Sequence, residues 1–260
     1  MSIKYLTDIR ASDTPLVGGK AARLGELMAA GHQVPTGFAV LAGSAISDEE
    51  LLTAYEELEL ENVAVRSSGI GEDGKDKSWA GQFATLLHVT QSELCQAVQT
   101  CIASAQSART RAYASGESFD LAVLVQQMIH SEIAGVAFSA NPVTGNRNEL
   151  VIESVYGLGE LLVQGTATPD NYLLTKQGNL LDQDIATKLT FLTYEQGATI
   201  EAAVPPHKQN NPSLKPRQLK ELARTVTAIE DHYGYPVDVE WAYGTTGQLY
   251  ILQARPITTL

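Results

Sequence analysis

The sequence predicts an α+β protein built from two lobes. With 260 residues the chain is long enough for one large domain or for two lobes around a shared cleft. Strand and helix patterns follow one another without strict βαβ alternation, which favours a mixed α+β fold. The last segment, residues 236–256, has the alternation of an antiparallel hairpin. We therefore expect an N-terminal lobe over residues 1–115 and a C-terminal lobe over residues 116–260.

Composition excludes several classes of partner. The formal net charge is −12 and the pI about 4.8, which argues against nucleic acid or an anionic membrane as a partner. No apolar run approaches the ~20 residues of a membrane span, and the N-terminus does not resemble a signal peptide. Cys95 and Cys101 lie in one predicted helix, roughly 9 Å apart, which is too far for a disulfide. These features predict a cytoplasmic protein with reduced thiols.

The elements can be placed along the chain from their patterns. Residues 176–216 are polar and contain proline, so we expect only connections and short elements there. Elsewhere the periodicity and the end signals predict a helix from the glycine pair Gly18–Gly19 to Gly31, a strand near 34–41, a helix capped by Ser47, a strand over 61–68, a helix capped by Thr90, strands over 121–129, 135–140 and 148–154, and a helix over 217–233 closed by Gly234.

The C-terminal hairpin carries an unusual set of side chains. A turn at Gly244–Gly247 with symmetric pairing would place Asp238 opposite Gln253 and Glu240 opposite Ile251. Because side chains alternate between the faces of a strand, one set of residues then shares a face and a second set points to the core. The first set is Asp238, Glu240, Gln253 and Arg255, and the second is Val237, Val239, Leu252 and Ala254.

The polar face of the hairpin has two interpretations. Carboxylate and amide oxygens are the ligands that Mg²⁺ accepts beside nucleotide phosphates, and an arginine can clamp a phosphate oxygen. The repulsion between Asp238 and Glu240 is itself a reason to expect a cation there. The alternative is a surface ladder in which Asp238 and Arg255 are neighbouring charges.

Two further segments suit anion binding. Gly18, Gly19 and Lys20 lie at a predicted helix N-terminus, where free N–H groups and the helix dipole favour an anion; a plain glycine turn is the alternative. Arg66 ends a strand beside two serines and needs an anionic partner, either a triphosphate or a carboxylate such as Glu72 or Asp73. The Gly-rich loop that follows suits a lid or an ordinary surface loop.

A third segment suits an adenine base. The apolar run "LAVLVQQMI" leads into Gln126 and Met128, which could flank an adenine or serve in the core. Glu153 could reach an adenine amino group or a ribose hydroxyl, or it could be a salt-bridged edge residue. The five histidines are scattered, and none has the context of a phosphorylated histidine.

Taken in order, these segments resemble a known family. The matching stretches are "GGKAARLGEL", "VPTGFAV", "VAVRSSGIGED", "SWAGQFATLLHV", "VLVQQMI", "GVAFSANPVTG", "ESVYGLGELLVQGTATPDNY" and "PVDVEWAY…LYILQARPIT", which together span residues 17–258. They are similar to the N-terminal ATP-grasp nucleotide-binding domain of phosphoenolpyruvate synthase, pyruvate phosphate dikinase and rifampicin phosphotransferase.

The resemblance implies a fold and a set of roles. It implies an ATP-grasp fold whose nucleotide lies between two α+β lobes, with a glycine-containing flap around Ser78–Gln82. By the resemblance, Lys20, Arg66 and Arg255 bind the triphosphate and act in catalysis, Glu240 and Gln253 are metal and phosphate ligands, and Gln126 with Met128 lies beside the adenine. From their own positions in the sequence we add Gly18 and Gly19 beside the phosphates, Asp238 at the metal and Glu153 at the adenosine.

The resemblance also implies an activity, an ATP-dependent phosphotransferase module that uses ATP and Mg²⁺. The acceptor of the phosphoryl or pyrophosphoryl group is then a histidine on a separate swivelling domain or chain, as in phosphoenolpyruvate synthase. A small-molecule acceptor and a non-catalytic ATP-binding regulator are the alternatives. The interval from Phe38 to Val65 is shorter than is usual in the family, and we expect the phosphohistidine domain on a partner because the chain holds no such histidine.

Overall fold

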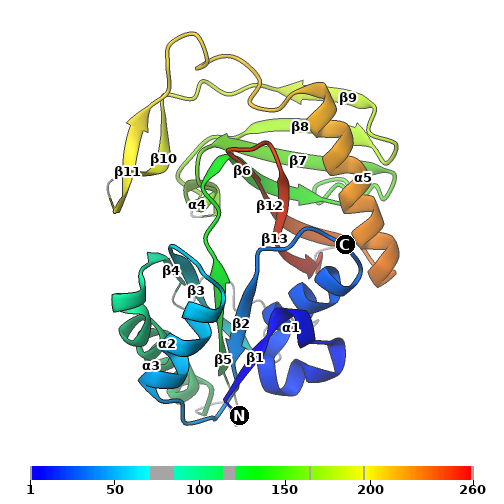
Figure 1. Ribbon diagram of the computed structural model, residues 1–260. Helices are drawn as coiled ribbons and strands as arrows, with labels where there is room; N and C mark the ends of the chain where they lie inside the picture. Colours follow the sequence, from blue (N-terminus) through cyan, green and yellow to red (C-terminus); the bar gives the residue numbers. More distant parts are fainter. Residues whose placement is uncertain (1, 71–84, 114–120, 164, 196, 259–260) are drawn as a thin grey trace. The chain divides into compact units, whose positions relative to one another are not determined.

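The computed structural model describes residues 2–70, 85–113, 121–163, 165–195 and 197–258. The chain divides into two compact units, unit 1 (Met1–Met128) and unit 2 (Ile129–Leu260), each combining helices with antiparallel sheet (Figure 1). Strand β5 (Leu121–Gln127), which we had grouped with the C-terminal lobe, is hydrogen-bonded between two strands of unit 1. Among the described helices, none has the length and apolar character that a membrane crossing requires.

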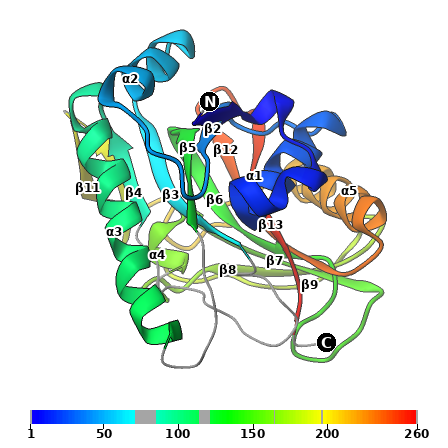
Figure 2. The ribbon, with the colours of Figure 1, turned by 90° about the horizontal axis from the view of Figure 1, so that it is seen from below.

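Unit 1 is a five-stranded antiparallel sheet with helices on both faces. Figure 2 shows α1 and α3 on opposite sides of β3 and β5. The strand order is β1-β2-β5-β3-β4, with β1 at Ile3–Tyr5, β2 at Gly37–Val40, β3 at Val63–Gly69 and β4 at Thr85–Val89. The helices are α1 (Thr14–Ala29), α2 (Asp48–Glu57) and α3 (Leu94–Tyr113). Short 3₁₀ turns occur at Leu6–Asp8, Ala11–Asp13 and Gln91–Glu93.

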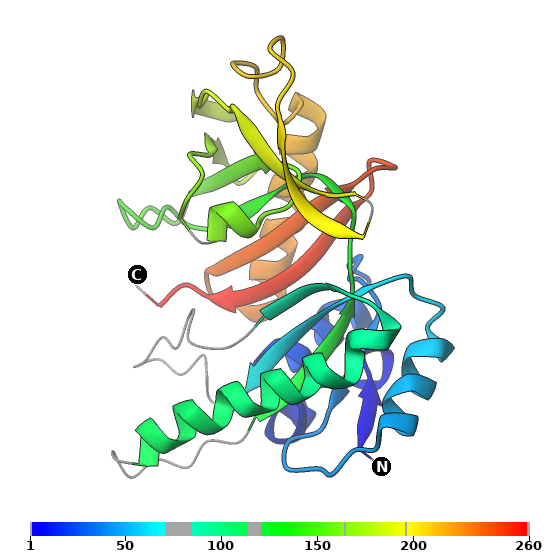
Figure 3. The ribbon, with the colours of Figure 1, turned by 90° about the vertical axis from the view of Figure 1, so that its left-hand side faces the viewer.

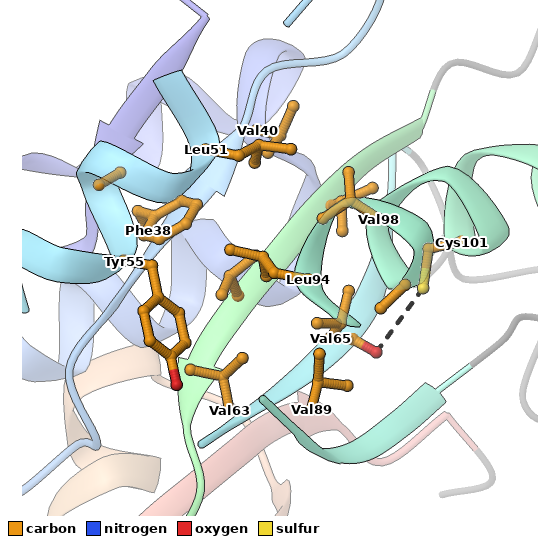
Figure 4. Close-up of a cluster of buried hydrophobic side chains, with 14 of the residues drawn as sticks. Phe38, Val40, Leu51, Tyr55, Val63, Val65, Val89, Leu94, Val98 and Cys101 are labelled. Atoms are coloured by element: carbon orange, nitrogen blue, oxygen red, sulfur yellow. Dashed lines mark hydrogen bonds between the residues drawn. The ribbon is translucent and has the colours of Figure 1, made fainter. Parts of the chain in front are cut away.

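One face of this sheet packs against α2 and α3 in a hydrophobic core. Val63 and Val65 of β3 pack with Phe38 and with side chains of α2 and α3 (Figure 4). The Cys101 thiol donates to the Val65 carbonyl oxygen at 3.6 Å, and burial raises the pKa of this thiol to about 12. Cys95 and Cys101 are both free, as the helical spacing predicts.

The opposite face of the sheet receives α1 at a close backbone contact. Gly18 has a φ of +74° and interrupts the helix with a kink, so the predicted glycine-pair start is a break inside α1. A Cβ on Gly18 would lie 2.1 Å from the Ser68 carbonyl oxygen. The N–H of Ala21 donates to Ser68 Oγ at 3.2 Å. Only glycine fits this junction, because both its φ and its contact exclude a side chain.

Unit 2 is a six-stranded antiparallel sheet with one long helix on one face (Figure 3). The strand order is β13-β12-β6-β7-β8-β9, with β6 at Ser131–Phe138, β7 at Glu149–Tyr156, β8 at Asp170–Thr175, β9 at Leu180–Asp184, β12 at Val237–Gly244 and β13 at Leu249–Pro256. A separate hairpin is formed by β10 (Thr190–Glu195) and β11 (Ala198–Ala203). The helices are α4 (Glu160–Val163) and α5 (Pro216–Tyr233).

Three of these strands lie where we expected only connections and short elements. In β9, β10 and β11 most side chains are exposed or half-buried, so the strands lack the apolar alternation by which a strand is recognised. Helix α5, in contrast, ends at Gly234 in the left-handed region with a φ of +74°, as predicted.

Helix α5 identifies the core face of the unit 2 sheet. The Tyr243 hydroxyl donates to the Gln218 carbonyl oxygen at 3.2 Å and to Glu221 Oε2 at 3.1 Å, both on α5. Val237 and Val239 alternate with the same period as Tyr243 and are fully buried. The α5 side of β12 is therefore the hydrophobic side, and the even-numbered residues of β12 face away from α5.

The terminal hairpin pairs in a different register from the symmetric one. The turn is correct, since Gly247 N–H donates to the Gly244 carbonyl at 2.8 Å. The pairs are Asp238 with Arg255 and Glu240 with Gln253, because the loop adds one residue and a β-bulge follows at Leu252. The polar set still shares one face, since Asp238, Glu240, Gln253 and Arg255 form two directly opposed pairs.

The bulge also changes the position of Leu252. We expected this side chain in the core with Val237 and Val239. It packs instead with Ile129, Ala134 and Ala242, on the face that carries Glu240. The extra residue in β13 has no partner opposite it, and this irregularity turns its side chain out of the alternation.

A buried carboxylate ties together the far end of unit 2. Asp170 is fully buried and pairs with the Lys188 ammonium group. The same carboxylate accepts from the backbone N–H of Ser213 at 2.8 Å, from its hydroxyl at 2.7 Å, and from the N–H of Ala186 at 3.0 Å. The Tyr172 hydroxyl is a further donor, at 3.3 Å. Asp170 thus joins β8 to the segments before β10 and α5.

We predict that Lys188→Met destabilises the protein by about 3–5 kcal/mol, because it leaves the Asp170 charge buried without its partner. Chemical denaturation measures the change. Lys208→Met, on an exposed side chain, is the matched control and should change stability by less than about 0.5 kcal/mol. Equal stability of the two variants would show that the buried pair does not hold unit 2 together.

We also predict that Gly18→Ala is more harmful than Gly31→Ala. Both glycines have positive φ, +74° and +87°, but a Cβ at Gly31 meets nothing within 4 Å. Gly31→Ala should cost about 1 kcal/mol from backbone strain alone, and Gly18→Ala should cost more because Ser68 must move. Thermal unfolding of the two variants compares these costs, and equal shifts would contradict the contact.

Candidate functional site

Unit 1 brings Lys20, Arg66 and Gln126 to one face of its sheet. Ala64 pairs with Gln126 and Arg66 with Leu124, and directly paired residues share a face, so Arg66 and Gln126 are on the same side. This is the side of Ser68, which holds the N–H of Ala21. Lys20 directly precedes Ala21 in the segment that follows the kink, and Lys20 and Arg66 are both half-buried. Three residues predicted from separate segments thus lie on the α1 face of unit 1.

Gln126 lies in an environment that does not satisfy its side chain. It is 2% exposed, and its Nε2 has no hydrogen-bond partner among the described residues. Met128 follows the end of β5, is half-buried, and donates its N–H to the Asn62 carbonyl oxygen at 3.2 Å. A buried donor without a partner is costly, so Gln126 does not behave as an ordinary core residue.

Unit 2 places the other predicted residues on the sheet face away from α5. Glu240 pairs with Gln253 on β13 and with Val136 on β6, and Val136 pairs with Glu153 on β7. Glu153 therefore shares the face of Glu240, two strands away, at about 10 Å for strands about 4.8 Å apart. Asn171 is paired with Glu153 and extends the same row.

Asp238 and Arg255 are the best-defined contact on this face. The Arg255 guanidinium donates to Asp238 Oδ2 through both Nε and Nη2, each at 2.8 Å. Asp238 is 7% exposed, and its Oδ1 has no hydrogen-bond partner in the described part of the chain. Arg255 thus compensates one oxygen of the buried carboxylate, and the other oxygen keeps no hydrogen-bond partner among the described residues.

The electrostatics of the face disfavour its negative charges. Burial raises the pKa of the Asp238 carboxyl, Arg255 opposes this shift, and the charge of Glu240 adds to it. Burial and the charge of Asp238 also raise the pKa of Glu153. The Asp238–Arg255 ladder that we considered as a surface alternative does form, but its carboxylate is buried. A cation would reduce the repulsion among these carboxylates and would give Asp238 Oδ1 a partner.

The chemistry of the donors on this face is limited to oxygen. Within the described ranges, no cluster of three or more His, Cys, Asp or Glu side chains is arranged to hold a metal ion. The set consists of two carboxylates, Asp238 and Glu240, with the Gln253 amide opposite Glu240. Oxygen ligands of this kind suit Mg²⁺ that is also bound by substrate phosphates, rather than a site made entirely by protein.

Some predicted features lie outside the described residues, and one buried residue was missed. The flap around Ser78–Gln82 and the acids Glu72 and Asp73 are not among the residues that the structure describes. Asn62, which we had not singled out, is 3% exposed, and its Oδ1 lacks a partner among the described residues. The sequence offered only a weak signal for it, a polar residue directly before the apolar strand "VAV".

Comparison with known proteins identifies relatives over nearly the whole chain. The family model "Pyruvate phosphate dikinase, AMP/ATP-binding domain" matches residues 43–260. The "Probable phosphoenolpyruvate synthase" of Methanocaldococcus jannaschii is 36% identical over 318 positions, which cover 99% of this chain and 27% of that protein. The phosphoenolpyruvate synthase of Pyrococcus furiosus is 32% identical, covering 99% of this chain and 44% of that protein.

A relative with a different name matches part of the chain. The "Prodigiosin synthesizing transferase PigC" of Serratia marcescens is 39% identical over 203 positions, which cover 76% of this chain and 23% of that protein. The chain thus spans between about a quarter and under half of these relatives. The alignment to the M. jannaschii protein runs over 318 positions, more than the 260 residues of this chain, so that relative has insertions without a counterpart here.

Solved structures show the same fold at low sequence identity. PH1788 from Pyrococcus horikoshii superposes with a TM-score of 0.52 at 13% identity, covering 92% of this chain and 89% of that one. The dinucleotide-forming acetyl-coenzyme A synthetase 1 of Ca. Korarchaeum cryptofilum, in complex with coenzyme A and Ca-AMPCP, has a TM-score of 0.51 at 12% identity and covers 95% of this chain and 96% of that one.

The fold and the family model agree with what the residues predict. The mixed helices and antiparallel sheets confirm the α+β, ATP-grasp fold class. The match over residues 43–260 confirms the resemblance to the nucleotide-binding domain of phosphoenolpyruvate synthase and its relatives. The chain belongs to the family of the pyruvate phosphate dikinase AMP/ATP-binding domain.

Proposed function

We propose that the chain is an ATP-dependent phosphotransferase module that binds MgATP and delivers a phosphoryl or pyrophosphoryl group to an acceptor. One observation carries this proposal. Asp238 keeps a buried, unpartnered carboxylate oxygen on the hairpin face that also bears Glu240, Gln253 and Arg255. Membership of an AMP/ATP-binding family supports MgATP as the ligand that this face receives.

The residues of unit 1 take the roles of binding and charge stabilisation. Lys20 and Arg66 bind triphosphate oxygens, with Gly18 and Gly19 keeping the chain beside Lys20 free of side chains, and Gln126 and Met128 border the base. Phosphoryl transfer involves little covalent chemistry from the protein, so fixed cations around the phosphates account for most of its catalysis. The contact between Gly18 and Ser68 keeps the backbone next to Lys20 fixed on the strand of Arg66.

The residues of unit 2 hold the metal and the remaining phosphate charge. The unpartnered Oδ1 and the raised pKa of Asp238 fit a site that binds a cation. Asp238, Glu240 and Gln253 would hold Mg²⁺, which when bound neutralises the charge on the phosphates. Arg255 stays paired with Asp238 and directs its remaining N–H donors to phosphate, and Glu153 binds the ribose or the adenine amino group.

The acceptor is a histidine on a separate domain or chain, or a small molecule. Most of the relatives described above are named phosphoenolpyruvate synthases, which favours the histidine acceptor and a swivelling partner domain. The name of PigC, a transferase, keeps the small-molecule acceptor as a second candidate. An acidic chain with two free cysteines suits a reaction in the cytoplasm.

The proposal is tested by binding and by products. Purified protein is titrated with MgATP by calorimetry, and nucleotide products are then resolved by chromatography, alone and with a phosphohistidine-domain partner. AMP formed only with the partner supports the histidine acceptor, whereas ADP formed with an added small molecule supports the second candidate. Binding without turnover under every condition would indicate a regulator, and absence of binding would refute the nucleotide site.

We predict that Lys20→Ala weakens MgATP binding by about tenfold to a hundredfold, since a charge-assisted contact to phosphate contributes about 1.5–3 kcal/mol. Calorimetric titration measures the change. Lys220→Ala is the matched control, because Lys220 is exposed on α5, on the other face of the unit 2 sheet. The role of Lys20 is refuted if both variants bind as wild type does.

We also predict that Mg²⁺-dependent nucleotide affinity falls as the pH decreases from neutral through the raised pKa values of Asp238 and Glu153. Burial raises the pKa values of Asp238 and Glu153, so protons compete with the cation at a higher pH than at an ordinary carboxyl near 3.9. The loss should approach tenfold per pH unit below the pKa for each proton taken up.

The same shift has the opposite sign for the stability of the protein without nucleotide. A carboxyl whose folded pKa is raised destabilises the fold as pH rises through that pKa, so Asp238→Asn should lessen this loss. Asp238→Asn should also flatten the pH dependence of binding, whereas Asp231→Asn, an exposed residue of α5, should retain it. Identical pH profiles for the two variants would contradict the assignment of Asp238.

A further inference from the structure

Asn62 and Gln126 are buried amides on one face of unit 1, and each has one polar atom without a hydrogen-bond partner among the described residues. Asn62 is 3% exposed and Gln126 is 2% exposed. The Asn62 Oδ1 acceptor and the Gln126 Nε2 donor are both unpartnered among the described residues. Each such group carries a desolvation cost of about 1–3 kcal/mol, so a pair of them calls for an explanation.

The strand register places the two amides close together. Ala64 pairs with Gln126, and the N–H of Met128 donates to the Asn62 carbonyl at 3.2 Å, which extends the ladder by one step. Asn62 is therefore opposite Met128 and diagonal to Gln126, at a distance of about 7–8 Å between Cα atoms. The small side chain of Ala64, which follows Asn62 by two residues and is directly opposite Gln126, is on the same face.

An internal role does not account for these amides. The backbone of Asn62 already pairs with Met128, so the side chain is not needed to hold the end of β5. The two amides do not bond each other, although one offers an acceptor and the other a donor. A ligand edge that presents both a donor and an acceptor would satisfy both groups.

We infer that Asn62, together with Gln126, binds the polar edge of the nucleotide base, and this inference rests on the proposed function. Asn62 directly precedes β3 and lies four residues before Arg66, which at about 3.3 Å per residue separates the two by about 13 Å. That separation has the scale of an extended nucleoside triphosphate, with its base at one end and its terminal phosphates at the other. Neutral amides suit the base end, and the cations Lys20 and Arg66 suit the phosphates.

A probe that lacks the base tests the assignment. Dissociation constants for MgATP and for magnesium tripolyphosphate are measured by calorimetry for the wild type, Asn62→Leu and Gln177→Leu. Asn62→Leu should weaken MgATP binding about 5- to 50-fold and leave tripolyphosphate binding unchanged, because one buried hydrogen bond to the base is lost. Gln177→Leu, at an exposed position of the turn after β8, should leave both constants unchanged.

Stability without nucleotide separates a binding role from a structural one. Replacing an unpartnered buried amide by leucine should raise the melting temperature, since the desolvation cost disappears. A lower melting temperature with unchanged MgATP affinity would show that Asn62 serves the fold, and would overturn the inference. A parallel loss of MgATP and tripolyphosphate binding would also overturn it, by placing Asn62 at the phosphates.

The outcomes also separate this inference from the proposed function. If the wild type binds neither MgATP nor tripolyphosphate, the proposed function fails and the assignment of Asn62 fails with it. If the wild type binds MgATP and Asn62→Leu binds it equally well, the module remains a nucleotide-binding protein and only the role of Asn62 is refuted. A preference for MgATP over MgGTP that disappears in Asn62→Leu would support base recognition directly.

Discussion

The buried carboxylate of Asp238 is the constraint on which the candidate site depends. The alternate residues of the same strand, Val237 and Val239, are fully buried on the α5 side, so Asp238 must face the other way. There the Arg255 guanidinium reaches only one carboxylate oxygen. Without Arg255 the buried charge of Asp238 would have no compensation. A bound cation would compensate the oxygen that Arg255 does not reach. The hydrophobic core of unit 2 therefore fixes the geometry of the polar face, although none of its core side chains belongs to that face.

Unit 1 reaches a similar result through a backbone contact. Gly18 lies so close to Ser68 that a Cβ would overlap the carbonyl, and the Ala21 N–H completes the junction through the serine hydroxyl. Helix and strand approach closely at this junction, with Lys20 two residues after Gly18 and Arg66 two residues before Ser68. This junction therefore fixes the backbone of Lys20 relative to the backbone of Arg66.

The sequence predicted the faces of the hairpin but not its register. A period of two keeps Asp238, Glu240, Gln253 and Arg255 on one face whether the pairing is symmetric or shifted by two residues, so that prediction did not depend on the turn. The bulge at Leu252 places this side chain against Ala134 and Ala242, which are distant from it along the chain, and no local pattern in the sequence indicates it. Strands β9 to β11 were predicted only as short elements of no stated type, because their largely exposed side chains carry no apolar alternation. Asn62 differs again, since an unpartnered amide can be recognised only when its surroundings are known.

The contrast between satisfied and unsatisfied buried groups is what separates fold from function in this protein. Asp170 has a cation, a hydroxyl pair and two backbone donors, so its burial is compensated within the chain and calls for no ligand. Asp238, Asn62 and Gln126 are also buried, yet in the part of the chain that the structure describes each keeps a polar atom without a partner. Trp241 Nε1 is also unpartnered but lies on the α5 face, and we assign no ligand to it. A folded chain retains such a cost where a bound molecule offsets it; a metal ion suits the carboxylate of unit 2, and a polar ligand edge suits the amides of unit 1.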